Sequence, residues 1–407
     1  MNHNKIRDRL ELKRVTVDHL DQFNELLRYV FQVSEDEIIS SGYDNENEIV
    51  RAKRPILTEA DVFGWFDNDG ELISQIAVYP CEVNMHGNMM KMGGITGVGT
   101  YPEFANLGLI SDLIYRALCE MRDNQQYISY LFPYSIPFYR HKGWEIISDQ
   151  MSFTLKDSQL PKTVPVRGHV ERLDIDDEDV YKIYDRFART HHGAMVRDRL
   201  AWEEYWRWEN EEDRYAAVYY DQNDEPTGLC FYWILDEVFH IKEMIFMNQD
   251  ARKGIWNFIS AHFSMIEEVR GKNYAGEAIA FNLEDSDIVE TIQPYYMARI
   301  VDVEGYLKQY PFMDTCDPFH FEIIDPVAPW NERIFGVEWD KNEDIIITDQ
   351  PIGECVKMDI GTLTTLMMGY KTVNDLARLG RIEASRRAQR SLARIVVVDR
   401  VYFSDYF

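Results

Sequence analysis

The chain has 407 residues, of which 45% are hydrophobic and 13% aromatic, so it can bury cores and is not a disordered protein. A domain typically takes roughly 100–200 residues, which predicts two or three domains. The formal net charge is −27, from 43 Lys and Arg against 70 Asp and Glu. A chain this acidic lacks the positive surface that binds nucleic acid, and its charge either attracts cationic partners or only aids solubility.

The five cysteines are odd in number, widely spaced and form no CxxC motif. This spacing argues against a disulfide scaffold or a structural zinc site and favours a reducing compartment. Residues 1–14 are charged and polar, without the apolar segment of a signal peptide, and no run approaches the ~18 apolar residues of a transmembrane helix. We therefore expect a cytoplasmic protein with no membrane span.

The first part of the chain predicts an α/β unit. Apolar residues recur at helical spacing after Asp18, and two apolar runs flank the turn signal Asp67-Asn-Asp-Gly70, which predicts a β-hairpin. A glycine-rich run keeps a strand pattern until Pro102 ends it, and an amphipathic helix follows. The expected elements are a helix over 18–31, strands over 62–66, 71–79, 81–85 and 93–101, and a helix over 108–121.

The second part repeats this order of elements, so we expect a degenerate tandem copy of the unit. A turn at 221–228 separates two apolar runs as the earlier turn does, and Gly254 lies at the start of the final helix, as Gly108 does in the first copy. The expected elements are strands over 214–220, 229–235 and 239–247 and a helix that follows Gly254 and carries the apolar residues Trp256, Ile259, Phe263 and Ile266.

From Tyr296 the pattern changes to a third segment punctuated by prolines. Thr372 and Gly380 have the residue types of a helix N-cap and of a C-terminal helix stop. The stretch 394–407 is too apolar and aromatic for a frayed end and is expected to dock against protein. The expected elements are strands over 332–339, 344–348 and 355–360 and helices over 361–370, 372–380 and 384–393.

Three polar clusters have simple structural interpretations. His191 and His192 lack a third ligand at metal spacing, which favours a solvated loop. The acidic run 174–179 lacks the EF-hand spacing and is expected to begin a helix, where carboxylates complement the dipole. The basic helix over 384–393 either binds lipid headgroups or, more simply, pairs with acidic surfaces.

The segment most informative about function joins the glycine-rich strand to the next helix. The strand ends at Val98-Gly-Thr100, and Leu107-Gly-Leu109 opens the helix after a short loop. A helix N-terminus presents free backbone N–H groups to an anion, and a glycine there lets a pyrophosphate approach closely. The segment has neither the P-loop nor the dinucleotide fingerprint, so it is either another kind of phosphate site or an ordinary strand-to-helix connection.

This order of hairpin, glycine-rich strand, Pro102, Gly108 and helix resembles the GNAT acyl-CoA N-acetyltransferases. Phe138-Tyr139 and Gly143-Trp144 stand where that family carries a tyrosine near the acetyl thioester and then a glycine–aromatic turn. The whole chain is similar to the Eis-type (enhanced intracellular survival) acetyltransferases. This resemblance implies an α/β (α+β) fold of two tandem GNAT domains followed by a sterol-carrier-protein-like domain. The implied domains are a catalytic GNAT domain over 1–157, a degenerate GNAT domain over 158–295 and the sterol-carrier-protein-like domain over 296–407.

The resemblance also implies a site in the first GNAT domain. Backbone groups of the strand and loop hold acetyl-CoA, Tyr139 protonates the leaving thiolate, and the terminal carboxylate of Phe407 is the base. Unlike the family, the loop 103–107 has no arginine, so a pyrophosphate would rely on backbone N–H groups. The second unit lacks the Phe-Tyr-x-x-x-Gly element and is expected to be a scaffold. The implied cofactor contacts are Val98, Gly99, Thr100, Asn106, Leu107, Gly108, Leu109, Ile110, Ser111, Tyr134 and Ser135.

These features predict an acetyl-CoA-dependent N-acetyltransferase that uses no metal. The acceptor is expected to be an amine of a cationic substrate, such as a polyamine, an aminoglycoside-like compound or a lysine side chain, that enters an acidic cleft and attacks the thioester directly. The resemblance implies a homo-oligomer, a hexamer, with no nucleic-acid partner. The alternative is a lipid- or hydrophobe-binding protein or scaffold with catalytically silent GNAT domains, which the missing loop arginines favour and Tyr139 disfavours.

Overall fold

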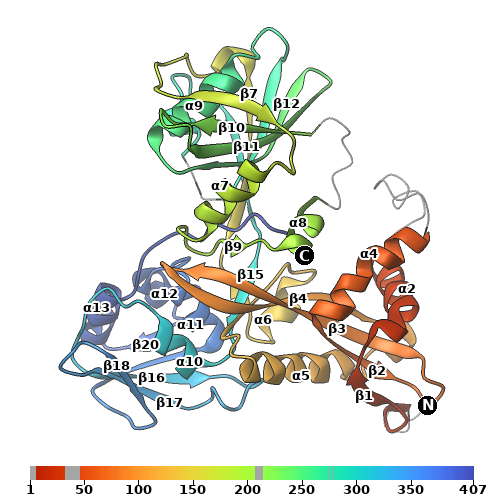
Figure 1. Ribbon diagram of the computed structural model, residues 1–407. Coiled ribbons are helices and arrows are strands. Elements are labelled where there is room, and N and C mark those ends of the chain that lie inside the picture. Colours follow the sequence, from red (N-terminus) through yellow and green to blue (C-terminus); the bar gives the residue numbers. More distant parts are fainter. Residues whose placement is uncertain (1–5, 33–45, 207–213, 275, 277) are drawn as a thin grey trace.

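The computed structural model describes residues 6–32, 46–206, 214–274, 276 and 278–407, which form three sheets with helices (Figure 1). The first sheet, at the lower right of Figure 1, has the strand order β1-β2-β3-β4-β5-β15-β6, and β9 pairs with β3. Its strands are β1 (Glu11–Arg14), β2 (Asp61–Phe66), β3 (Leu72–Met85), β4 (Asn88–Thr100), β5 (Ile128–Leu131), β6 (Glu145–Ile146), β9 (Met195–Val196) and β15 (Met297–Ile300).

Helices cover both faces of the first sheet. They are α2 (Leu20–Phe31), α4 (Glu46–Glu59), α5 (Leu109–Asp123) and the short α6 (Ile136–Arg140), with 3₁₀ turns η1 (Val17–His19) and η2 (Pro102–Phe104). The apolar stripe of α5 packs on the face that carries Phe63 and Ile95. Helices α2 and α4 cover the opposite face, where Phe23 and Ile56 meet Phe66.

The expected hairpin forms, but the strands expected over 71–79 and 81–85 are one continuous strand, β3. Proline has no N–H for a sheet ladder and is tolerated where a strand has a neighbour on one side only. Strand β2 pairs with β3 only as far as Val78, so Pro80 has only Gly93 of β4 opposite it. A proline in this pattern therefore does not end the strand.

The second sheet, at the top of Figure 1, has the order β14-β7-β13-β12-β11-β10-β8. Its strands are β7 (Asp149–Lys156), β8 (His169–Leu173), β10 (Tyr215–Tyr220), β11 (Pro226–Leu235), β12 (Val238–Phe246), β13 (Glu268–Asn273) and β14 (Val289–Pro294). The accompanying helices are α7 (Glu178–Ala188), α8 (Arg199–Trp206) and α9 (Gln249–Ser260), with 3₁₀ turns η3 (Asp157–Gln159) and η4 (Ala280–Asn282). The acidic run before α7 begins a helix as expected, and Asp177 is its N-cap.

The two larger sheets repeat one topology and exchange a strand. In each, three antiparallel strands and a helix lead to a parallel pair, β4 with β5 and β12 with β13. The strand beyond that pair comes from the other side of an expected boundary: β7, before 157, joins the second sheet, and β15, after 296, joins the first. The expected boundaries at 157 and 296 therefore do not separate the sheets, because pairing follows the free sheet edge rather than chain order.

The third sheet, at the lower left, has the order β18-β17-β16-β19-β20. Its strands are β16 (Phe319–Ile324), β17 (Ile334–Trp339), β18 (Ile345–Thr348), β19 (Glu354–Asp359) and β20 (Glu383–Ala384), and its helices are α10 (Val303–Gln309), α11 (Ile360–Met367), α12 (Val373–Arg378) and α13 (Arg386–Ile395). Every residue of α11 is buried, because the helix lies between this sheet and β15. The basic α13 pairs with acidic residues of its own chain, through Arg387–Asp317 and Arg394–Asp314.

Residues 396–407 form no helix or strand but dock where the three sheets meet (Figure 1). Val401, Tyr402 and Phe403 are buried in the largest core, which confirms the expected docking. The His191-His192 turn beside them is not the solvated loop that its sequence favoured, because His192 is buried and stacks on His86.

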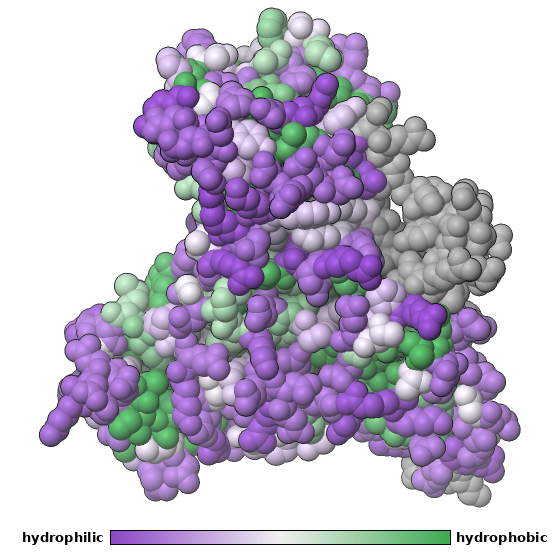
Figure 2. Space-filling view, viewed as in Figure 1, coloured by the Kyte–Doolittle hydropathy of each residue, from purple (hydrophilic) through white to green (hydrophobic). Residues whose placement is uncertain are grey.

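The visible face of the molecule is mostly hydrophilic and narrows between the upper sheet and the two lower ones (Figure 2). Within the described ranges, no helix is both long and apolar enough to cross a membrane. In the same residues, no group of three His, Cys, Asp or Glu side chains has the geometry to hold a metal ion.

Candidate active site

Strand β4 bends and loses one sheet neighbour along its second half. Gly97, at φ +60°, and Val98 lie opposite a single residue of β3, which makes a β-bulge. Strand β5 pairs with β4 only at 92–94, so beyond Gly94 β3 is the only sheet neighbour of β4 among the residues that the structure describes. The sheet leaves backbone N–H and C=O groups of this stretch unused on the β5 side, where a ligand can bind them.

The N-terminus of α5 begins without a side-chain cap. Its N-cap residue is Gly108 at φ +79°, a left-handed conformation in which glycine is the favoured residue. Asn106, before it, also has a positive φ of +63°. The first-turn N–H groups of α5 therefore lie open at the end of the loop that leaves β4.

Tyr139 is held at one position by α6 and the turn that follows. Ser135 caps the helix by accepting from Phe138 N–H, and the Tyr139 carbonyl accepts from the N–H groups of Lys142 and Trp144. The Tyr139 ring packs edge-on against Phe138, at a centroid distance of 5.1 Å. Burial raises the pKa of Tyr139 to about 12, so its phenol keeps its proton at neutral pH.

Phe407 lies against β4 at the point where β5 stops pairing. A Cβ on Gly94 would lie 2.8 Å from the Phe407 ring, so the ring needs glycine at this position of the strand. The Phe407 N–H donates to the Tyr296 hydroxyl at 3.2 Å. The end of the tail is thus fixed by a ring contact and a main-chain hydrogen bond.

A cavity of about 860 Å³ brings these elements together. Its lining includes every residue that the sequence analysis singled out for cofactor binding or catalysis. They are Val98, Gly99, Thr100, Asn106, Leu107, Gly108, Leu109, Ile110, Ser111, Tyr134, Ser135, Tyr139 and Phe407.

The cavity is not the acidic cleft that the net charge suggested. Its α2 and α4 side is largely apolar, and the charged side chains of its described lining are two cations, Arg28 and Lys53, and one carboxylate, Glu204. Carboxylates gather instead in a small adjoining pocket that Phe407 also borders and that Glu59, Asp198 and Glu204 line. The sequence did not reveal these residues because Glu59 ends α4 whereas Asp198 and Glu204 lie just before and on α8, far along the chain, and none of them belongs to a motif.

Two cations that the sequence did not reveal lie beside the α5 N-terminus. Arg7 donates to the Leu107 carbonyl at 3.1 Å and pairs with Asp112 at 2.5 Å. Lys142 donates to the Ser111 hydroxyl at 2.8 Å. The loop 103–107 itself has no cation, as expected, but its surroundings are not devoid of positive charge.

The corresponding helix of the second sheet, α9, is closed at its N-terminus. Asn248 accepts from Ala251 N–H, and Asp250 accepts from the Tyr219 hydroxyl at 2.7 Å. Gly254 lies inside α9 rather than at its start as expected, because the helix begins at Gln249, and the Tyr219 ring packs against it, where a Cβ would lie 2.1 Å from the ring. The protein's own side chains therefore fill the place that lies open in the first sheet.

Three family matches cover most of the chain. Residues 11–147 and residues 193–300 each match the acetyltransferase (GNAT) domain, and residues 303–404 match the sterol carrier protein domain. These matches confirm the expected tandem GNAT fold and the nature of the third domain.

Solved structures and a relative resemble the chain along its length. A conserved protein of unknown function from Enterococcus faecalis, described as a probable N-acyltransferase, is 26% identical with a TM-score of 0.87 over 98% of this chain and 99% of that one. Eis1 from Mycobacterium abscessus shares the fold at 16% identity, with a TM-score of 0.80 over 98% of this chain and all of that one.

An uncharacterised N-acetyltransferase from Streptomyces avermitilis is 22% identical over 392 residues, 87% of this chain and 91% of the relative. The chain therefore belongs to the GNAT N-acetyltransferases, with the Eis-type arrangement of two GNAT domains followed by a sterol-carrier-protein-like domain.

Proposed function

We propose that the first GNAT domain transfers an acetyl group from acetyl-CoA to the amine of a cationic acceptor. The observation that carries this proposal is the single cavity shared by the open edge of β4, the uncapped start of α5, Tyr139 and Phe407. The self-capped α9 supports assigning the reaction to the first domain and a scaffold role to the second.

The residues around the α5 loop suit acetyl-CoA, which supplies an activated thioester. Open N–H groups at Gly108 and in the first turn of α5 would bind its pyrophosphate, and Ser111, Tyr134 and Ser135 would line the rest of its path. Backbone N–H groups at 98–100 would donate to the thioester carbonyl oxygen as negative charge develops there. This binding relies on backbone groups, with Arg7 and Lys142 as neighbouring cations.

Two groups would move protons. Tyr139, neutral at physiological pH, would donate its phenolic proton to the departing thiolate sulfur. The main-chain carboxylate of Phe407 would take a proton from the acceptor's ammonium group, directly or through a water, so that the neutral amine can attack the thioester carbon. Adding two residues after Phe407 would replace that carboxylate by an amide, so kcat should fall by roughly 10²-fold while acetyl-CoA binding is kept.

The lining of the cavity indicates which chemical groups the acceptor carries besides its amine. Phe23, Leu27 and Ile56 present apolar surface on the α2 and α4 side, whereas the pocket behind Phe407 is acidic. An acceptor with an ammonium group and an apolar body suits both surfaces better than a compound charged along its whole length. Lysine-type and aryl-alkyl amines are therefore favoured over polyamines and aminoglycosides.

A binding and turnover experiment tests the proposed function. Saturating acetyl-CoA should raise Tm, and NAD and ATP should not, because only a ligand that binds the native state stabilises it. Release of the CoA thiol should then be measured with phenethylamine, N-acetyl-lysine methyl ester, spermidine and kanamycin. A Tm that responds to a fatty acid but not to acetyl-CoA would instead support the hydrophobe-binding alternative.

We also propose that the protein assembles with copies of itself, as the family resemblance to hexamers implies. The edge strand β14 is exposed at all six of its residues, and it carries the apolar Val289 and Ile292. Exposed apolar edge strands are typical interaction surfaces. Light scattering that gives the 48.0 kDa monomer mass at micromolar concentration would contradict this assembly.

A further inference from the structure

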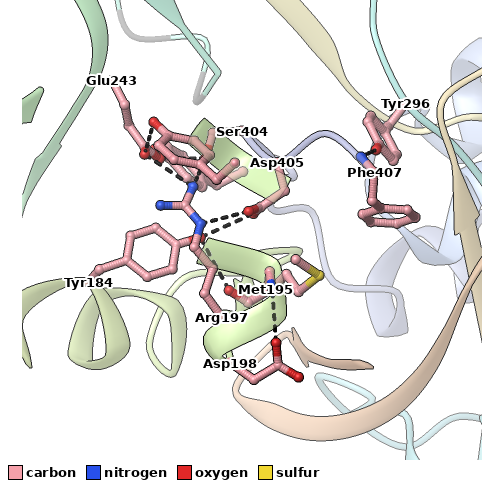
Figure 3. Close-up of polar contacts among 12 residues, drawn as sticks. Tyr184, Met195, Arg197, Asp198, Glu243, Tyr296, Ser404, Asp405 and Phe407 are labelled. Carbon is pink, nitrogen blue, oxygen red and sulfur yellow. Dashed lines mark hydrogen bonds and ion pairs between the residues drawn. The ribbon is translucent and has the colours of Figure 1, made fainter. Parts of the chain in front are cut away.

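One buried ionic cluster, in the segment between β9 and α8, contacts the tail of the chain. The Arg197 side chain is fully buried. Its Nε donates to Asp405 Oδ1 at 2.6 Å, while its Nη2 donates to Glu243 at 3.1 Å and to the Ser404 hydroxyl at 3.0 Å. Figure 3 shows the guanidinium pointing between these acceptors, with Phe407 set apart beside Tyr296. Arg197, a residue of the second GNAT segment, thus binds Asp405, two residues before Phe407.

The cluster is built for a charged guanidinium. The Arg197 guanidinium lies 3.7 Å from the ring centroids of both Tyr184 and Tyr205, so its two faces are covered by aromatic rings. Burial opposes its charge, but the carboxylates of Asp405 and Glu243 hold the pKa of Arg197 well above its usual value. The planar fork of arginine meets several acceptors at set angles, which a lysine ammonium cannot reproduce.

The tail is also held from the side of the first sheet. The Asp405 carbonyl accepts from the Tyr295 hydroxyl at 2.8 Å, and the Phe407 N–H donates to Tyr296. Both tyrosines directly precede β15. Between the Arg197 cluster and these tyrosines, Asp405 is fixed through its side chain and its main chain, which leaves Phe407 little freedom to move.

An apolar cluster would stabilise this junction at least as well, since burying charges costs several kcal/mol per ion before their attraction is counted. Ion pairs and hydrogen bonds differ from apolar contacts in fixing direction and register. We propose that Arg197 is a positioning residue for acetyl transfer. By binding the Asp405 carboxylate, it fixes the position of Phe407 in the cavity of the first GNAT domain. This inference rests on the proposed function of Phe407, and it gives the second GNAT domain a part in the reaction.

The same contacts argue against Asp405 as a catalytic base, although it lies close to Phe407 in the chain. Its carboxylate is 2% exposed and accepts from Arg197 and from the Tyr184 hydroxyl, and it does not line the cavity. The role that the structure assigns to Asp405 is to be held rather than to exchange protons with the acceptor.

The experiment compares Arg197→Lys and Asp405→Asn in the full chain with Ile255→Ala, a buried α9 residue far from the tail whose truncation also destabilises the second domain. Arg197→Lys and Asp405→Asn should both increase amide hydrogen exchange in residues 396–407 and lower kcat by about 10-fold or more. The reason is that displacing a catalytic group by ~1 Å lowers the rate by up to about 10²-fold. The Kd for acetyl-CoA should stay within about threefold of wild type, since no phosphate contact changes.

The pH profile separates positioning from simple loss of stability. Without a correctly positioned base, the amine must lose its proton in solution before it binds. The ratio of wild-type kcat/KM to that of Arg197→Lys or Asp405→Asn should therefore decrease as pH rises toward an amine pKa of about 10.4. Ile255→Ala should lower Tm without this change of profile.

Three results would overturn the inference. The first is faster hydrogen exchange in residues 396–407 with a wild-type kcat. The second is wild-type hydrogen exchange and wild-type kcat in both Arg197→Lys and Asp405→Asn. Either result would leave the proposed function intact. A wild-type protein that binds acetyl-CoA but acetylates no amine would overturn the proposed function and the positioning role with it, and hydrogen exchange would still report whether Arg197 anchors the tail.

Discussion

Tyr139 combines two properties that a general acid needs. It lines the cavity, and burial raises its pKa to about 12, so the phenol is protonated throughout the physiological range. The Tyr139→Phe variant keeps the ring and its packing but removes the proton. Its kcat should fall by roughly 10²–10⁴-fold, the usual contribution of a general acid, while the Kd for acetyl-CoA changes by no more than a few-fold.

Tyr115 offers a matched control outside the cavity. It lies on α5, is 45% exposed and does not line the cavity, so removing its hydroxyl should disturb neither packing nor proton transfer. Measuring kcat and acetyl-CoA binding for Tyr115→Phe and Tyr139→Phe side by side checks the assignment. Equal turnover by the two variants would mean that water or another group protonates the thiolate.

Gly94, on the strand that the Phe407 ring contacts, offers a second test of the position of Phe407. A methyl group there would come within 2.8 Å of the Phe407 ring, so Gly94→Ala must push the ring and the end of the tail away. Because a displaced catalytic group loses rate steeply, kcat should fall by about 10-fold or more. Steady-state kinetics and a Tm measurement check this, and a fully active, stable variant would show that the tail position does not matter.

The proposed acetyl-CoA site depends on the start of α5. Gly108 has φ +79°, where a side chain strains the backbone, and its Cβ would lie 3.3 Å from Arg7. Gly108→Ala should therefore distort the loop by an energy of about 1–2 kcal/mol and raise the Kd for acetyl-CoA by roughly 10-fold. Isothermal titration checks the affinity.

Gly380 provides the control for backbone strain alone. It has a similar φ of +71°, and a Cβ there would meet nothing within 4 Å. Gly380→Ala should lower Tm to a similar extent but leave the affinity for acetyl-CoA unchanged. If both variants weakened binding equally, the effect would come from global destabilisation rather than from the loop.

Local patterns predicted most elements, because apolar periodicity and turn residues act over a few residues. The turn signal at 67–70 correctly predicted the first hairpin, and Thr372 caps α12 as expected. The exchange of β7 and β15 could not be predicted in this way. Both strands have patterns that fit either sheet, and only the assembled molecule offers the free edges that they fill.

The residues of the candidate site also divide into those that local sequence or family resemblance predicts and those that only the folded structure reveals. The strand-to-helix pattern pointed to Gly108, the family resemblance pointed to Tyr139 and Phe407, and all three line one cavity. Arg28, Lys53 and Glu204 were missed because nothing in their local sequence distinguishes them from solvated charges. Asp405, a buried partner of Arg197, can be recognised only once the distant segment 195–198 is placed beside the tail.

At the scale of the whole molecule, a pair of stacked histidines joins the three domains. His86 lies in the β3–β4 turn and His192 before β9, and their ring centroids are 3.5 Å apart. Each ring contacts a carbonyl at the end of α11, His86 that of Met367 and His192 that of Met368. Movement of any one domain would therefore disturb this contact.

This stack predicts how stability depends on pH. Burial and the neighbouring His86 ring lower the pKa of His192 to about 3, and burial also lowers the pKa of His86 although Asp399 opposes the shift. These histidines bind protons near pH 6.5 in the unfolded chain but not in the folded protein, so their contribution to stability is fully present above pH 6.5 and is lost as pH drops below it. His192 alone should lower the free energy of unfolding by about 2 kcal/mol between pH 7.5 and pH 5.

Urea titrations across this range measure how the free energy of unfolding depends on pH. His192→Gln removes the titrating group and should flatten the dependence, whereas His141→Gln, which changes an exposed histidine, should leave it as in wild type. An unaltered slope in His192→Gln would assign the acid sensitivity to other groups.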